Sequence, residues 1–520
     1  MPDIMQEPLT VFTQLPPTKP RLKHIVETFE QKYGSKPAYI ARAPGRIASR
    51  IALRFAGLAK VSIIGEHIDY AGLSVMPAAI DRDVIQACLA SPSKDGKSRV
   101  HISNVNDKFK PEDFDFQPGK EGPVLDSKHH SWVNYFKAGM KGALGHMSPD
   151  DSKTAIELHI LVDGNVPPGG GLSSSAAMVV SSAIATLKAF GAVESTTQGQ
   201  LATIAIDSER LVGVNSGGMD QSASIFSREG ALLNIGFVPK LVATLVPIPT
   251  TKPAITYVIA SSLVTSEKQV TAKYNYNLRV VEMRVVARIL CSYLKLNIPM
   301  ELPTLKHVMD AYFSSSAMHT SSEFLIERKR RLKIMLDIVE DVFGDKKDGC
   351  TWDEVYERLG GMNKDSFKQA FHADFEIEAE KLQLYKRAKH AYSEAARVYQ
   401  YRSLLEQAGD NDPDLALKLG HLMDESQESC RDLFNCSCPE IDEICTIARK
   451  SGSLGSRLSG AGWGGCTVHL VLEDRQDELI QALQSEYYAK HYPKLSGEEL
   501  QEAIFATKPE EGACLYDLAS

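Results

Sequence analysis

The first half of the chain alternates short apolar runs with longer runs of helical periodicity. Ala38–Pro44 and Ala155–Gly164 have the apolar, β-branched character of strands. Ser174–Phe190 and Gly199–Gly213 instead carry small and apolar residues at helical spacing. This alternation predicts an α/β or α+β lobe.

From about Val264 onward the pattern changes to long amphipathic helices. They are predicted over Asn275–Leu296, Ser321–Phe343, Glu376–Gly409 and Asp414–Phe434. Near the end, Gly462–Asp474 returns to a strand pattern and Arg475–Lys490 to a helical one. The second half should therefore combine many helices with a small antiparallel sheet.

The length of the chain predicts two lobes. Hydrophobic cores stop growing at about 250 to 300 residues, and the chain has 520. We place the boundary so that residues 1–245 form an N-terminal lobe and residues 246–520 a C-terminal lobe. The basic run Glu327–Lys333 lies within a predicted amphipathic helix, so a solvated helix face is favoured over a targeting signal.

Composition and charge narrow the function classes. Apolar residues make up 43% of the chain and charged residues 24%, as in an ordinary globular protein. The net charge of −8 argues against a nucleic-acid-binding surface, which needs a concentrated basic face. The sequence has neither a membrane-spanning run nor a signal peptide, and a cytoplasmic location is expected.

The nine cysteines are an odd number scattered along a long chain. This pattern predicts reduced thiols rather than a disulfide framework. The close pair Cys436 and Cys438 lacks a second pair and a histidine partner, so a metal site there is not favoured.

The segment Val166–Met178, with the sequence VPPGGGLSSSAAM, carries the first candidate chemistry. Its prolines and glycines form a turn almost without side chains, and its serines open an apolar helix. Backbone N–H groups and the helix dipole at such a start suit phosphate oxygens. The segment is not a Walker loop, and its alternative interpretation is an ordinary glycine-rich loop with a serine N-cap.

Two further glycine-rich segments are ambiguous when taken alone. In Ser208–Gln221, glycines surround Asp220, a candidate base or magnesium ligand, and Glu209 lies eleven residues earlier as a second carboxylate. The segment Ser456–Thr467, SRLSGAGWGGCT, leads into a predicted strand.

Taken together and in this order, the motifs resemble those of the GHMP small-molecule kinases. The sequences GEHIDY (Gly65–Tyr70), GGMDQ and SGAGWGGC make the chain similar to galactokinases, and NYNLRVVE, LYKRAKHAYSEAARV and LMDESQESCRDLFNCSCPEID look like the fungal branch. The resemblance runs from about Leu22 to Tyr516. It implies an α+β, two-lobed fold: a ribosomal S5 domain 2-like N-terminal lobe and a helix-rich, ferredoxin-like C-terminal lobe, with the active site between them.

The resemblance also implies an activity, the ATP-dependent phosphorylation of α-D-galactose at C1, the first committed step of galactose catabolism. It places the sugar beside Glu66, His67, Asp69, Gly217 and Tyr276. It assigns Asp220 as the base and Arg46 as the arginine that neutralises phosphoryl charge. In-line phosphoryl transfer needs chiefly positioning and charge stabilisation, which such groups supply.

For ATP the resemblance implies a cradle made by the serine-rich loop. Its members are Pro168, Gly169, Gly170, Gly171, Leu172, Ser173, Ser174, Ser175 and Ala176. Ser175 and Glu209 are the implied Mg²⁺ ligands. A related yeast group without kinase activity acts as a galactose- and ATP-dependent transcriptional regulator that binds a repressor, and it lacks a serine-alanine pair in this loop. The loop is intact here, so the enzyme is favoured over a pure regulator, and some members of this branch combine kinase activity with regulation.

One feature departs from the family pattern. Fourteen residues, Ile47–Lys60, separate Arg46 from Val61, whereas in the family an arginine directly precedes this position. Lys60 now occupies the adjacent place, and a lysine does not reproduce the planar fork of an arginine. The insert is either a real loop or a retained piece of untranslated sequence, and we favour the latter. The fold should tolerate it better than catalysis does.

Overall fold

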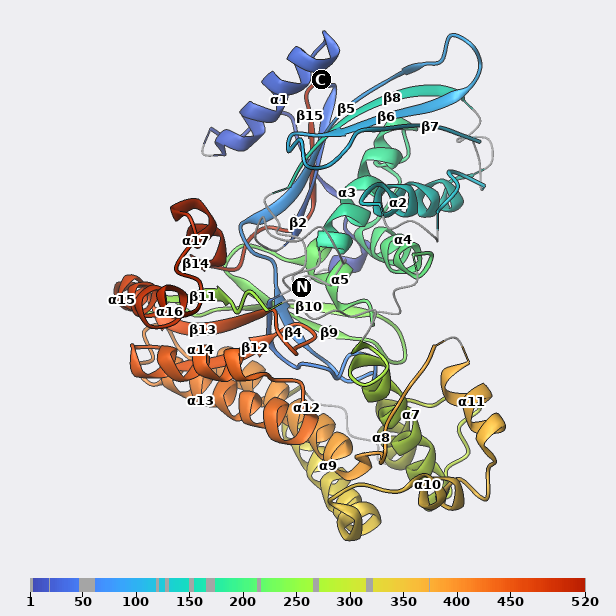
Figure 1. Ribbon diagram of the computed structural model, residues 1–520, viewed down its shortest axis with the longest axis vertical. Helices are drawn as coiled ribbons and strands as arrows, with labels where there is room; N and C mark the ends of the chain where they lie inside the picture. Colours follow the sequence, from blue (N-terminus) through green and yellow to red (C-terminus); the bar gives the residue numbers. More distant parts are fainter. Residues whose placement is uncertain are drawn as a thin grey trace.

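Figure 1 shows the computed structural model of the chain. It describes residues 3–17, 19–45, 61–117, 121–126, 131–148, 154–164, 174–212, 217–264, 271–314, 321–373 and 375–519. Arg46 and the whole insert lie outside the described residues, as do Pro168–Ser173 of the serine-rich loop.

The described residues form a seven-stranded sheet in the first lobe, with the order β1-β15-β2-β5-β8-β6-β7. Its strands are β1 (Thr10–Phe12), β2 (Tyr39–Gly45), β5 (Arg82–Pro92), β6 (Ser98–Asn104), β7 (Glu112–Phe116), β8 (Ile156–Gly164) and β15 (Cys514–Asp517). The pairs β1–β15 and β6–β8 are parallel, and the other neighbours are antiparallel. The sheet thus includes a strand from the far end of the chain.

Helices cover both faces of this sheet because its central strands are apolar on both faces (Figure 1). On β5, Ile85 packs with α1 (Pro20–Tyr33), and Val84 belongs to the core on the other face. The helices on that other side are α2 (Val133–His146), α3 (Ser174–Ala189), α4 (Gln198–Arg210) and α5 (Met219–Phe226). α3, α4 and α5 contact one another, which brings two of the predicted motifs together.

The second lobe contains a four-stranded antiparallel sheet in the order β12-β13-β11-β14. Its strands are β11 (Ile255–Ser261), β12 (Gly455–Ser459), β13 (Cys466–Leu472) and β14 (Ile504–Thr507). Its helices are α7 (Tyr276–Tyr293), α8 (Leu305–Phe313), α9 (Ser321–Phe343), α10 (Trp352–Arg358), α11 (Lys364–His372), α12 (Leu384–Gln407), α13 (Leu415–Glu428), α14 (Pro439–Lys450), α15 (Gln476–Leu483), α16 (Ala489–His491) and α17 (Gly497–Ala503). π-helical turns follow α13 at Ser429–Phe434 and α15 at Gln484–Tyr488.

Two hairpins lie in the middle of the molecule (Figure 1). β3 (Val61–Ile64) pairs with β4 (Met76–Ala78), and β9 (Ala231–Gly236) pairs with β10 (Val242–Pro247). β2 and β3, which flank the insert, therefore belong to different sheets. Closing the insert would therefore join a strand of the first lobe directly to this central hairpin.

Several sequence predictions are confirmed. The fold is two-lobed α+β, the basic run lies within α9, and all nine cysteines are free. None of the helices in the described part of the chain has the length and apolar character that crossing a bilayer requires. The division into 1–245 and 246–520 stays a prediction, and the membership of β15 in the first sheet shows that one cut cannot separate the two sheets.

Candidate active site

The predicted sugar-binding motif is a tight turn that follows β3. Gly65 has φ 104° and His67 has φ 60°, so two residues of the turn adopt left-handed backbone conformations. A Cβ atom on Gly65 would lie 3.0 Å from side-chain and backbone atoms of Val398 and Val75. Only glycine satisfies both constraints at this position, and the turn that presents Glu66 and Asp69 depends on it.

Helix α12 holds the backbone of this turn. The buried carboxylate of Glu394 accepts the N–H of Gly65 at 2.9 Å and that of Glu66 at 3.4 Å. Nε2 of His390 donates to the Glu66 carbonyl at 3.0 Å, and its Nδ1 accepts from the Ser429 hydroxyl at 2.8 Å. These contacts fix the backbone positions from which the side chains of the turn extend.

Electrostatics keep Glu394 ionised and His390 neutral. Burial raises the pKa of Glu394, but the charges of Arg397 and Arg457 outweigh it and bring the pKa down to about 2. Burial lowers the pKa of His390 to about 4. A charged acceptor and a neutral ring therefore support the turn at neutral pH.

The side chain of Glu66 lies against β12. Its Oε2 is 3.2 Å from a guanidinium nitrogen of Arg457, and both side chains are buried. Arg457 also donates to the Ser62 carbonyl at 2.8 Å. The glycine-rich third motif thus joins the sugar-binding turn through a buried ion pair.

His67 sits in an aromatic cage. Its ring stacks on Phe434 with centroids 4.7 Å apart, and Tyr276 and Trp463 approach within 5.9 and 5.8 Å. Nε2 donates to the Ala461 carbonyl at 2.9 Å, and Nδ1 accepts from the Tyr70 hydroxyl at 3.2 Å. Both ring nitrogens already have partners in the protein, so direct hydrogen bonding of His67 to a sugar stays a prediction.

Asp69 and Gly217 meet across the site. A Cβ atom at position 217 would lie 2.5 Å from Oδ2 of Asp69, so the close approach requires the missing side chain. Gly218, with φ 91°, then opens α5, and Asp220 lies in its first turn. The structure brings the predicted base and a predicted sugar ligand to the same place.

Tyr276, the first residue of α7, marks the convergence of the motifs. Burial raises its pKa well above the ordinary value, and the negative charges of Asp69, Asp220, Glu66 and Glu209 raise it further. Its hydroxyl is therefore protonated and can donate a hydrogen bond. These carboxylates come from the first-lobe and central segments, and Tyr276 comes from the second lobe.

The described part of the predicted ATP site is the start of α3. Ser175 and Ala176 lie buried in its first turn. Glu209 is buried in the last turn of α4 and accepts a hydrogen bond from the Gln221 amide of α5. Hydroxyl and carboxylate oxygens are hard donors of the kind that Mg²⁺ takes. The role of Ser175 and Glu209 as metal ligands stays a prediction.

The end of β2 lies beside the helix that carries Asp220. The Ser224 hydroxyl, one turn further along α5, donates to the Pro44 carbonyl at 3.0 Å. The chain next reaches Arg46, which lies outside the described residues. The choice between Arg46 and Lys60 as the active-site cation therefore stays open.

Sequence reasoning missed the residues that support the turn. The segments LYKRAKHAYSEAARV and LMDESQESCRDLFNCSCPEID carry the resemblance to the fungal branch but have no predicted site residue, and both contact the turn. The first contains His390 and Glu394, and the second contains Phe434, which stacks on His67. Arg457 fell within a motif that had no assigned role. The one available signal was the presence of charged residues within otherwise apolar helical faces.

Two protein-family models match separate parts of the chain, one in each half. The family "GHMP kinases N terminal domain" matches residues 134–228, and "GHMP kinases C terminal" matches residues 413–489. Together with the two-lobed fold and the converging motifs, these matches define a kinase of the GHMP class.

A third family, "Galactokinase galactose-binding signature", matches residues 59–89. Galactokinase of Schizosaccharomyces pombe is 37% identical over 98% of this chain and 98% of its own length. Galactokinase of Saccharomyces cerevisiae is 37% identical over 96% of each chain. The chain belongs to the galactokinase family.

Among solved structures, galactokinase of Lactococcus lactis complexed with galactose superimposes with a TM-score of 0.62. The two are 20% identical, and the match covers 95% of this chain and 99% of that one. This similarity confirms the fold. The galactose-binding signature begins its match at residue 59, so Arg42–Arg46 before the insert lies outside it.

Proposed function

We propose that the protein transfers the γ-phosphoryl group of ATP to the C1 hydroxyl of α-D-galactose. The observation that carries the proposal is the convergence of Asp69, Asp220, Glu66 and Glu209 on Tyr276. Such a set of acceptors, three of them buried and Asp69 partly exposed, suits a polyhydroxylated substrate together with one protonated phenol, because sugar hydroxyls both donate and accept. The full-length similarity to galactokinases supports the choice of sugar.

In this proposal Asp220 is the base. The C1 oxygen attacks the γ-phosphorus, its proton passes to the Asp220 carboxylate, and the bond to the β-phosphate oxygen breaks to release ADP. The position of Asp220 in the first turn of α5, directly after the turn at Gly218, supports this role. Its carboxylate is buried, which restricts competing proton transfer from water.

The ATP side of the site would use the start of α3. Backbone N–H groups there would bind the phosphates, and Ser175 and Glu209 would hold Mg²⁺. Bound Mg²⁺ supplies charge neutralisation on the phosphate oxygens. Gln221 orients the Glu209 carboxylate through its amide hydrogen bond. In the absence of nucleotide, Glu209→Gln should weaken Mg²⁺ binding, which isothermal titration measures directly.

Selectivity for galactose would come from Glu66, Asp69 and Tyr276. A pocket whose buried polar groups pair with one set of hydroxyls rejects an epimer that leaves them unpaired, commonly by about a hundredfold or more. Glucose should therefore be phosphorylated far less efficiently than galactose. Equal kcat/KM values for the two sugars would contradict the assignment of this pocket.

The deciding experiment is galactose-dependent ADP release by the full chain, compared with Asp220→Asn. The variant should bind galactose within a few-fold of the native protein and lose most turnover, by about a hundredfold or more. Asp207→Asn is a matched control, because this carboxylate is exposed on α4 and pairs with Arg210 in a surface contact. Full activity of Asp220→Asn would refute its role as base.

The same assay distinguishes the second candidate, a galactose- and ATP-dependent regulator that binds a repressor. Binding of both ligands without ADP release would favour the regulator. The enzyme is the better supported because the relatives that match over the full length are galactokinases. A cytoplasmic location also stays a proposal, which cell fractionation would test.

A further inference from the structure

A second cluster of chemically active side chains lies far from the active-site turn, on the face of the first-lobe sheet that α1 partly covers. Over residues 98–102 of β6 and 156–160 of β8, buried and partly exposed residues alternate. Val100, Ile102, Leu158 and Ile160 point into the core beneath α2 and α3. The residues between them along each strand therefore point to the opposite face of the sheet, which α1 partly covers.

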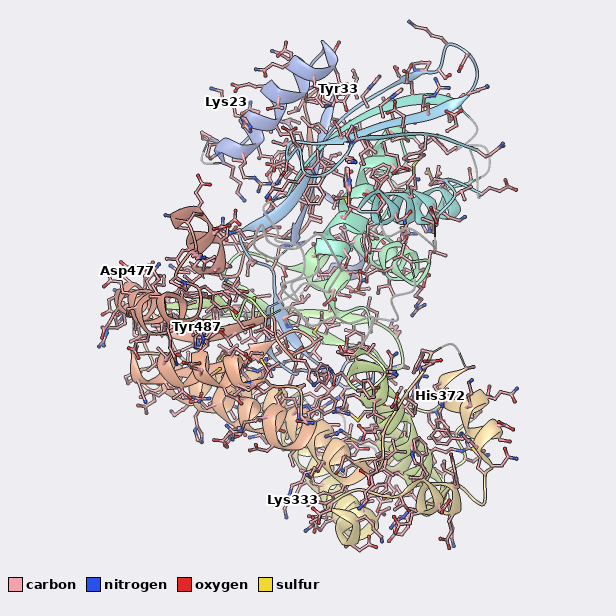
Figure 2. All side chains as sticks on the ribbon, in the orientation of Figure 1. Lys23, Tyr33, Lys333, His372, Asp477 and Tyr487 are labelled. Carbon is pink, nitrogen blue, oxygen red and sulfur yellow. The ribbon has the colours of Figure 1, made fainter. Side chains whose placement is uncertain are left out.

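α1 covers only part of this face. It contacts β5 and β8 and ends at Tyr33, which Figure 2 labels beside the strands. The Tyr33 hydroxyl bonds to Ser103 of β6 at 2.8 Å, and its ring lies 5.0 Å from that of His159. Beyond Tyr33, polar side chains of β6 and β8 remain partly exposed.

His101, Glu157 and His159 come together at this uncovered place. The register pairs His101 with His159 on adjacent parallel strands, and their rings stack with centroids 4.7 Å apart and planes 12° apart. Oε1 of Glu157 lies 3.3 Å from Nε2 of His101 and 3.7 Å from Nε2 of His159. All three ligand atoms lie within 4.8 Å of one another.

These distances suit a tetrahedral metal ion. Bonds of about 2.0 to 2.2 Å at tetrahedral angles put neighbouring ligand atoms about 3.4 Å apart. Both contacts of Glu157 are close to that separation, and the two ring nitrogens lie within 4.8 Å of each other. The partly exposed position leaves room for a water molecule as the fourth ligand.

The surroundings of His101 favour a cation at this place. Its Nδ1 lies 3.0 Å from Oδ1 of Asp113 on β7, and its Nε2 is buried without a hydrogen bond among the described residues. With the ring proton donated to Asp113, the lone pair of Nε2 points toward a carboxylate oxygen of Glu157. A metal ion between them turns this repulsion into coordination, and the Asp113 contact fixes the tautomer, as in carboxylate–histidine–zinc sets.

We propose that His101, Glu157 and His159 bind a transition-metal dication of the Zn²⁺ class on the outer face of the first lobe, with Asp113 orienting His101. Two imidazoles and one carboxylate select Zn²⁺, Cu²⁺, Ni²⁺ or Co²⁺ over Mg²⁺ and Ca²⁺, which prefer sets made of oxygen. The site is separate from the phosphoryl-transfer residues. A metal ion bound there would therefore be a property of the first lobe that is separate from the kinase reaction.

The test is Zn²⁺ binding to the full chain, measured by competition with a chromophoric chelator in excess Mg²⁺. The double variant His101→Gln/His159→Gln should lose one equivalent of bound Zn²⁺. Asp113→Asn should keep the stoichiometry and weaken the affinity by about 10- to 100-fold. Co²⁺ substitution should give the visible spectrum of a tetrahedral nitrogen and oxygen site in the native chain and not in the double variant.

His421→Gln is the matched control. His421 on α13 lies 3.2 Å from Glu425 in an exposed pair, and no third ligand joins it within the part of the chain that the structure describes. It should leave Zn²⁺ binding unchanged, and galactose-dependent ADP release confirms that each variant is folded. Identical Zn²⁺ stoichiometry and affinity in the native chain and the double variant would overturn the proposal, as would a Co²⁺ spectrum that shows only thiolate ligation.

Discussion

Replacing Glu394 by glutamine tests whether the sugar-binding turn depends on a charge that comes from the other lobe. The substitution keeps the shape of the side chain and removes its charge. The carboxylate accepts two backbone N–H groups of the turn, the Ser426 hydroxyl at 2.6 Å and the Arg397 guanidinium at 2.8 Å. An amide nitrogen in place of one oxygen would face at least one of these donors.

The expected loss of stability follows from two independent arguments. The pKa of Glu394 falls from 4.5 to about 2 in the fold, and at about 1.4 kcal/mol per pKa unit this corresponds to about 3 kcal/mol. Removing one partner of a buried ion pair typically costs about 3 to 5 kcal/mol. We expect Glu394→Gln to lower the free energy of unfolding by about 3 kcal/mol.

Catalysis should change as well, because the turn carries Glu66, His67 and Asp69. A displacement near 1 Å can cost about a hundredfold in rate, so kcat/KM for galactose should fall by about tenfold or more. Urea unfolding and steady-state kinetics measure the two effects. Glu406→Gln is the control on the same helix, because Glu406 makes a partly exposed pair with Arg402 at 2.8 Å. Equal stability of the two variants would refute the reasoning.

Further predictions concern pH, close packing and the insert. The pKa of buried His390 is about 4, below its unfolded value of 6.5, so its contribution to stability is complete above about pH 6.5 and is lost as pH falls toward 4. Urea unfolding of His390→Gln over this range should therefore show a shallower pH dependence of stability than the native chain. An unchanged slope would contradict the conclusion that His390 is buried as the neutral ring. Gly217→Ala would place a Cβ atom 2.5 Å from an oxygen of Asp69, so it should raise KM for galactose by about tenfold or more. Gly145→Ala, which meets nothing within 4 Å, should leave KM unchanged, and similar KM values in these two variants would exclude the steric argument. Deleting Ile47–Lys60 should raise turnover by about a thousandfold, the contribution of an arginine in related phosphoryl transfer; equal or lower ADP release would show that the insert is part of the working site.

The spacing of apolar residues predicted the helices well where contacts within the helix itself determine its ends. The predicted helix Ser321–Phe343 has the same bounds as α9. The next predicted helix starts at Glu376, whereas α12 begins at Leu384. The intervening backbone bonds elsewhere: the Glu378 N–H donates to the Lys273 carbonyl, and Leu382 exchanges two hydrogen bonds with Cys350. Such pairing with distant residues overrides a helical pattern and leaves no local trace.

The site was predictable to the extent that it lies in motifs. Glu66, Asp69, Gly217 and Asp220 belong to short glycine-rich segments, and the structure brings them together. The supporting groups were not predictable, because Glu394 acts on a turn 328 positions away. Its chemical role depends on burial and on the partners that α12 meets there, which one sequence without its fold does not reveal.

The position of β15 also bears on how the chain is made. Residues 514–517 pair with β2 on one side and β1 on the other. Figure 1 shows the C-terminal end of the chain back beside α1, after the whole second lobe has been traversed. While a ribosome is still adding the second lobe, β2 has an open edge that can pair with another nascent chain. The sheet of the first lobe is thus closed only after residues 514–517 have been synthesised, and a chain released before that point would keep the unpaired edge of β2.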